Sequence, residues 1–137
     1  MKKALLFILA ILLVCIAPLL AAAGGFDGSA PLLCAAVETF DCVENGDCQQ
    51  GTPQSINFPQ FLKINFKTKI ISGGQVDGKE RTSKIKNMEH SEGRLILQGT
   101  QNGKGWSIVI TETTGNMTLS ASDNKVGFVV FGGCTPQ

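Results

Sequence analysis

The feature that most constrains the fold of this chain is a two-residue alternation of apolar and polar side chains. It begins at Phe61 and continues in short segments to Cys134, with Gly, Asn, Asp or Ser between the segments. In one segment Leu62, Ile64 and Phe66 would share a face, while the residues between them point the opposite way. A period of two is typical of a strand with one buried face. This part of the chain is therefore predicted to form antiparallel strands.

Turn residues indicate where these strands connect. Asn102-Gly103 is the strongest hairpin signal, because this pair favours the type I′ turn that joins twisted strands. Further turns are expected at Gly73-Gly74, 91–93, 114–116 and Asp123-Asn124. A strand and turn at every 10 to 12 residues, roughly, indicates an all-β meander.

The predicted fold class is a small antiparallel meander barrel, or barrel-like sandwich, of about seven or eight strands tied by disulfides. Closure is favoured because it removes the exposed edges of the sheet. The segment from Pro31 to Phe40 leaves an alternative open, since Leu32, Ala36 and Phe40 also fit helical spacing. A strand is expected there, followed by a loop from Gln50 to Pro59.

The N-terminal residues are typical of a targeting segment. Two lysines precede an unbroken apolar run from Ala4 to Ile16, and small residues follow up to Ala23. This order indicates a secretory signal peptide at 1–23, cleaved after Ala23, with a single domain at 24–137. An uncleaved anchor is the alternative, because a bilayer needs about 20 apolar residues. The mature chain is expected to be exported, periplasmic or secreted, without a membrane span.

Five cysteines are present, and Cys15 falls within the expected signal peptide. A lipoprotein cysteine is not expected there, because the branched Val14 precedes it. An even number of cysteines in an exported chain indicates that they pair, and four cysteines would form two disulfides. The four that remain in the expected mature chain are Cys34, Cys42, Cys48 and Cys134.

Distance selects among the three possible connectivities. Along one extended strand Cys34 and Cys42 would be about 26 Å apart, whereas bridged Cα atoms lie about 6 Å apart. Cys42–Cys48 with Cys34–Cys134 is preferred over the remaining arrangement, because it suits a tight turn at 43–47 and ties the first strand to the last. A two-residue turn would place Cys48 opposite Val43, so a bulge or longer loop is required.

Composition excludes several classes of function. The chain carries a net charge of +1, from 12 basic and 11 acidic residues, and has one histidine. Neither a polybasic nucleic-acid-binding arm nor a multi-histidine metal centre fits these counts. The cysteine spacing also lacks the paired knuckles of zinc sites. No metal, cofactor or nucleic-acid partner is expected.

Three features are candidates for function. Lys63, Lys67, Arg81 and Lys84 are expected to face outward and could form a basic strip that binds an acidic protein surface or an anionic envelope polymer. A solvated outer face is the simpler interpretation. Trp106, on the inward side of its segment, is either a core residue or a ligand contact.

His90 is the one imidazole available for acid–base chemistry. It lies in a polar turn-like segment, and the sequence shows no Gly-x-Ser-x-Gly nucleophile elbow to accompany it. A solvated histidine is therefore expected, and no catalytic residue is assigned.

Four segments carry a resemblance to known proteins: 26–29, 31–35, 57–61 and 105–134. They resemble a group of small exported bacterial β-rich proteins of uncharacterised function. The resemblance implies export and a compact domain, and it brings no activity or site residue.

The function predicted first is a non-enzymatic binding or accessory module of the bacterial envelope, acting through a rigid barrel surface. The alternative is a calycin-like carrier that holds a small apolar ligand inside the barrel. A hydrolase using His90 is the third possibility. A connected interior cavity would favour the carrier, and a barrel filled by side chains would favour the surface module.

Overall fold

A computed structural model describes residues 25–76 and 78–137, so the expected signal peptide lies outside the described residues. Within these ranges the chain forms strands and one short 3-10 turn, η2. Their bounds are β1 (Leu32–Val43), β2 (Cys48–Gly51), η2 (Pro53–Ile56), β3 (Phe61–Asn65), β4 (Ile70–Val76), β5 (Lys79–Ser91), β6 (Arg94–Gln101), β7 (Lys104–Thr111), β8 (Asn116–Ser122) and β9 (Val126–Pro136).

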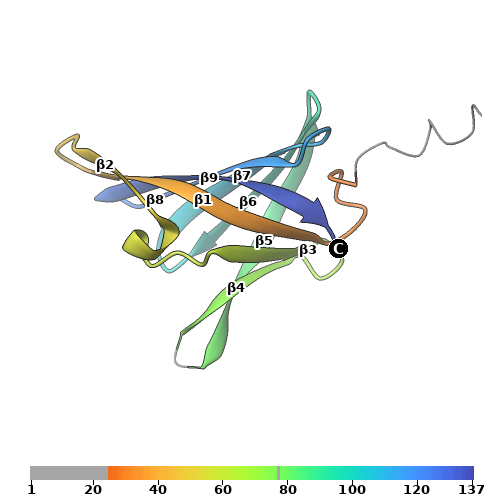
Figure 1. Ribbon diagram of the computed structural model, residues 1–137, viewed down its shortest axis with the longest axis horizontal. Helices are drawn as coiled ribbons and strands as arrows, with labels where there is room; N and C mark the ends of the chain where they lie inside the picture. Colours follow the sequence, from red (N-terminus) through yellow and green to blue (C-terminus); the bar gives the residue numbers. More distant parts are fainter. Residues whose placement is uncertain (1–24, 77) are drawn as a thin grey trace, which may run out of the picture.

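The strands form a closed eight-stranded antiparallel barrel with one extra strand, β2 (Figure 1). From β3 to β9 each strand pairs with the next in sequence, and β9 returns to pair with β1 from Val126 to Pro136. The predicted all-β meander barrel is confirmed. No helix among the described residues has the length and apolarity needed to cross a membrane.

Strand β1 has two partners along one edge. Its first part, from Leu32 to Ala35, pairs with β3, and its second part, from Thr39 to Cys42, pairs with β2. A bulge between Ala36 and Glu38 in its pairing with β9 separates the two parts. Bulges bend a strand and increase its twist, which lets β1 leave β3 and continue into the β1–β2 hairpin. The helical alternative for 31–40 is excluded.

The hairpins follow the turn chemistry in two places. Asn102 and Gly103 both have positive φ, 50° and 77°, between the paired residues Gln101 and Lys104. This is the two-residue type I′ geometry that the sequence predicts. A second turn of the same kind lies at 92–93, where φ is 49° and 73°.

The prediction of a turn at Gly73-Gly74 is wrong. Strand β4 continues through both glycines to Val76, and a bulge lies between Ser72 and Gln75. A Cβ on Gly73 would lie 2.4 Å from the carbonyl oxygen of Phe61, so a larger residue does not fit there. The two glycines therefore allow close approach of neighbouring backbone rather than a chain reversal.

The segment 50–59 is also more ordered than the predicted loop. Gln50 and Gly51 belong to β2, and Pro53 begins the 3-10 turn η2 with its ring buried. Proline suits the first position of such a turn because its φ is already fixed and its missing N–H is not needed. This turn carries the chain from the β1–β2 hairpin to the start of β3.

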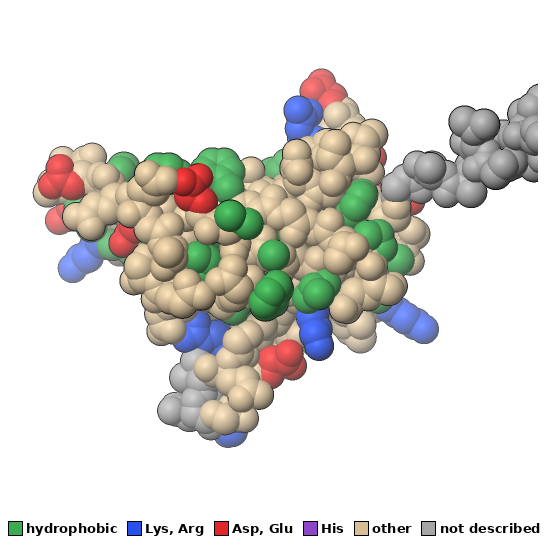
Figure 2. Space-filling model, in the orientation of Figure 1, with side chains coloured by type: hydrophobic (Ala, Val, Ile, Leu, Met, Phe, Trp, Pro, Cys, Tyr) green, Lys and Arg blue, Asp and Glu red, His purple; other side chains and the backbone are tan. Residues whose placement is uncertain are grey.

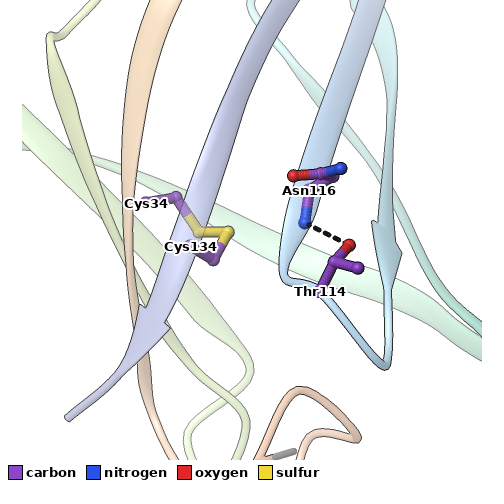
Figure 3. Close-up of a disulfide and its surroundings, with 4 residues drawn as sticks. All are labelled: Cys34, Thr114, Asn116 and Cys134. Atoms are coloured by element: carbon purple, nitrogen blue, oxygen red, sulfur yellow. Dashed lines mark hydrogen bonds between the residues drawn. A yellow bond between two sulfur atoms is a disulfide. The ribbon is translucent and has the colours of Figure 1, made fainter.

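Both preferred disulfides are present. Cys34 and Cys134 are directly opposite on β1 and β9, with their Cα atoms 3.9 Å apart (Figure 3). Cys42 and Cys48 are opposite on β1 and β2, 4.1 Å apart. The loop between them has a hydrogen bond from the Val43 N–H to the Asp47 carbonyl and a positive φ at Gly46, as a longer loop requires.

Two layers of side chains fill one half of the barrel. Each layer consists of inward-facing residues that are neighbours across the sheet, and their side chains are fully or almost fully buried. The first layer contains Leu95, Ile110 and Met117, and the second contains Leu97, Ile108, Leu119 and Val130. Phe26, which precedes β1, packs against this core. This half of the barrel is a packed hydrophobic core, not a lumen.

Candidate ligand-binding cavity

The third layer of inward residues contains two aromatic side chains, which the two layers below it lack. Gly99, Trp106, Ala121 and Phe128 are neighbours across β6, β7, β8 and β9. A residue with no side chain and a residue with one methyl group thus lie on either side of the tryptophan. Small barrels commonly place small residues beside large ones in this way, so that the large side chains fit.

The indole of Trp106 lies directly over Gly99. A Cβ at Gly99 would lie 2.3 Å from the indole Cζ2 and 2.6 Å from Cε2. The indole Nε1–H donates to the Ser83 Oγ across β6, at 2.9 Å. This hydrogen bond fixes the ring against the barrel wall, so the single tryptophan lines the interior rather than filling it.

A cavity of about 530 Å³ occupies this half of the barrel. Its size lies within the range of about 300 to 1,000 Å³ that is typical of small-molecule sites. Aliphatic and aromatic side chains provide most of its wall. They are Ile56, Phe58, Leu62, Ile71, Trp106, Ile108, Leu119, Ala121 and Phe128.

The loop between η2 and β3 contributes one wall of this cavity. Phe58 packs edge-on against Phe128, with ring centroids 6.1 Å apart and an interplanar angle of 63°. Pro59 lies against the bulge of β4, where a Cβ on Gly74 would be 3.1 Å from its ring. The loop thus rests on β4 and β9 at once and partly covers the cavity.

Polar side chains surround the same cavity on β5, β6 and β7. Arg81 donates two hydrogen bonds to Asn57, from Nη1 to the carbonyl oxygen at 2.6 Å and from Nη2 to Oδ1 at 2.9 Å. Gln101 donates through Nε2 to the Thr82 carbonyl at 3.1 Å. The cavity therefore combines an apolar wall with a small number of hydrogen-bonding groups, as ligand sites do.

Lys104, which also lines the cavity, is paired with a carboxylate. Its Nζ hydrogen-bonds to the Asp123 carboxylate across the β7 and β8–β9 segments. That hydrogen bond, followed by those from the backbone N–H groups of Lys125 and Val126, holds the pKa of Asp123 well below its ordinary value. Asp123 therefore stays ionised at neutral pH, and its negative charge offsets the positive charge of Lys104.

The structure does not bring the four predicted basic residues together. Ser83 pairs with the buried Ile71, so it faces inward, and Arg81, two residues earlier on β5, lies on the same side and lines the cavity. The expectation that Arg81 faces outward beside Lys84 is wrong, because residues three apart on a strand point to opposite faces.

The three lysines lie outside the barrel. Lys63 is exposed on β3 and Lys84 on β5, while Lys67 belongs to the turn after β3, which ends at Asn65. Exposed apolar side chains interrupt this surface: Phe61 on β3 is 56% exposed. Figure 2 shows hydrophobic side chains over β1 and β3, with basic side chains along the lower edge of that face. Recognition of an anionic partner by these lysines stays a prediction.

His90 contacts a carboxylate rather than a nucleophilic hydroxyl or thiol. Its Nδ1 lies 2.6 Å from Oε1 of Glu112, and its side chain is 51% exposed. No hydroxyl or thiol in the described ranges hydrogen-bonds to its ring. Likewise, residues 25–76 and 78–137 contain no group of three or more His, Cys, Asp or Glu side chains placed to hold a metal ion.

Of the residues that line the cavity, Trp106 was identified from the sequence as a possible ligand contact, and its small neighbours Gly99 and Ala121 were not. Gly99 and Ala121 carry the signal, because both are small residues at inward positions beside an inward tryptophan. Asn57 and Ser83 could not be identified in this way, since their contacts join segments that are far apart in the sequence. No family model and no curated protein sequence matches this chain.

Proposed function

We propose that this protein binds a small, largely apolar molecule inside its barrel. The observation that carries the proposal is the cavity of about 530 Å³ with an aliphatic and aromatic wall. An eight-stranded barrel is just wide enough to hold one small ligand when its interior side chains leave room. Gly99 lets the Trp106 indole lie against the barrel wall, and Ala121 adds only one methyl group beside it.

This proposal favours the carrier alternative over the surface module. The basic strip that was the candidate surface for that module is not continuous, because Arg81 lies on the cavity side of β5. The apolar wall of the cavity also has a direct energetic use, because burying apolar ligand surface stabilises a complex by about 25 cal/mol per Å² before the costs of association.

A variant that fills the cavity tests the proposal. The neutral fluorophore N-phenylnaphthylamine is titrated into the protein, and energy transfer from the single Trp106 reports its binding. Wild type is expected to bind, and Ala121→Phe is expected to bind at least about tenfold more weakly, since a loss of 1.4 kcal/mol corresponds to that factor. Ala121 lines the cavity and is 8% exposed.

Gln98→Phe is the matched control. Gln98 is exposed on the outer face of β6, so the same ring is added there without entering the cavity. Equal binding by the two folded variants, or no binding by wild type to any apolar probe, would contradict the proposal.

We also propose that the protein works in an oxidising compartment after export. Disulfides persist mainly in such compartments, and the two bridges of this barrel support the proposal.

A further inference from the structure

We propose that the ligand carries one anionic group, a carboxylate in the simplest case, and that Arg81 binds it at the cavity. This inference rests on the proposed function and specifies the chemical class of the ligand. The ligand would be amphipathic, with an apolar body against Trp106 and Phe128 and an acidic end against β5.

The charges around the cavity support this class. Its lining contains two cations, Arg81 and Lys104, and no carboxylate. Lys104 is paired with Asp123. Arg81 forms no ion pair with any acid in the described ranges, 25–76 and 78–137. One positive charge is thus left beside an apolar space, where an anion would compensate it better than a neutral group would.

The hydrogen-bonding groups suit a carboxylate. A guanidinium has five N–H donors in a planar fork, and it commonly binds both oxygens of a carboxylate. Two of these donors are used on Asn57. Ser83, on the same side of β5, accepts from the indole of Trp106, so its own hydroxyl hydrogen is left to donate.

Arg81 is also held in place before any ligand arrives. Its two hydrogen bonds to Asn57 anchor the guanidinium to the loop that covers the cavity. An ordered side chain loses less conformational entropy on binding than a mobile one. The same contact holds the loop, so the test separates ligand binding by Arg81 from its positioning of the loop.

Three probes with the same alkyl chain and different head groups distinguish these two roles of Arg81. Decanoate, 1-decanol and decylamine each compete with N-phenylnaphthylamine in the Trp106 energy-transfer assay. Wild type is expected to bind decanoate at least about tenfold more tightly than decanol, because a charge-assisted hydrogen bond is about twice as strong as a neutral one. Decylamine is expected to bind most weakly.

Arg81→Gln should remove the preference for the acid. Decanoate is expected to lose about tenfold or more in affinity and decanol less than about twofold, since only the charged head group is affected. Lys84→Gln removes the same charge from the outer face of the same strand and should leave both affinities unchanged. If Arg81→Gln does not fold, Arg81→Lys replaces it: the charge remains without the fork, and the preference should fall by a smaller factor.

The outcomes separate this inference from the proposed function. Equal binding of decanoate and decanol by wild type would overturn the role of Arg81 and leave the cavity function standing. A parallel loss of both ligands in Arg81→Gln would show that the side chain only holds the loop. If wild type binds none of the three probes or the fluorophore, the proposed function itself fails.

Discussion

Gly99 determines the position of the indole of Trp106 because it has no side chain. The two residues are directly paired on β6 and β7, and the ring occupies the space that a Cβ would need. Ser83 on β5 then accepts the indole N–H. Three residues on three strands thus place one aromatic ring along the cavity wall.

Gly99→Ala is expected to disturb this arrangement. A Cβ there would meet the indole at 2.3 Å and the Lys84 carbonyl at 2.6 Å. Overpacking of this kind costs about 1 to 3 kcal/mol, so the free energy of unfolding should fall by that amount in urea titrations. The emission maximum of Trp106 should move as well, since the ring must leave its position.

Gly105→Ala provides the control for this change. A Cβ at Gly105 has no atom within 4 Å, and the residue neighbours Trp106 in the chain. The explanation fails if the two alanine variants unfold at the same denaturant concentration with unchanged emission.

Arg81 shows at the scale of a residue how a pattern can be misread. Its charge suggested that the side chain faces outward. Side chains alternate between the two faces of a strand, so Arg81 and Lys84, three residues apart, point to opposite faces, and Arg81 is on the inner one. Charged residues are seldom buried without partners. Here the side chain is only half-buried, and Asn57 accepts two of its hydrogen bonds.

At the scale of the elements, the two disulfides restrain different parts of the barrel. Cys34–Cys134 joins the first and last strands of the closed sheet, which are 100 residues apart in sequence. Cys42–Cys48 closes the β1–β2 hairpin across a separation of 6. The first bridge holds the barrel closed, whereas the second stabilises a local turn.

Removal of the two bridges should therefore have unequal effects. Loop entropy predicts a loss of about 4 to 5 kcal/mol for Cys34→Ala with Cys134→Ala and about 2 kcal/mol for Cys42→Ala with Cys48→Ala. Cys34 is fully buried, so its truncation adds to the larger loss. Guanidinium titrations of both double variants measure the difference, and an equal or reversed order would refute it.

At the scale of the whole molecule, the barrel has a packed half and a hollow half. The packed half contains the two layers of buried side chains and the contact of Phe26. The hollow half contains the cavity and the loop that partly covers it. The packed half stabilises the barrel, and the hollow half contains the proposed binding site.

Cleavage of the expected signal peptide is a further prediction for the whole molecule. Mass spectrometry of the mature protein should give a chain that begins at Gly24 and contains two disulfides, with a mass lower by two hydrogen atoms per disulfide than that of the reduced chain. Cleavage leaves both bridges intact because all four cysteines follow Ala23. Retention of Met1, or a lipid on Cys15, would contradict the signal-peptide interpretation.

The sequence by itself determined the fold class, the hairpin at Asn102-Gly103 and the pairing of the cysteines. These depend on local rules: strand alternation, turn chemistry and the reach of an extended chain. Closure of β1 on β9 followed from the position of Cys134 relative to Cys34.

Only the tertiary structure decided where the interior is hollow. The cavity depends on which inward residues become neighbours across four strands, namely Gly99, Trp106, Ala121 and Phe128. The contact of Arg81 with Asn57 spans 24 residues of sequence. Register between strands determines both features, and a one-residue shift in register would place different side chains together.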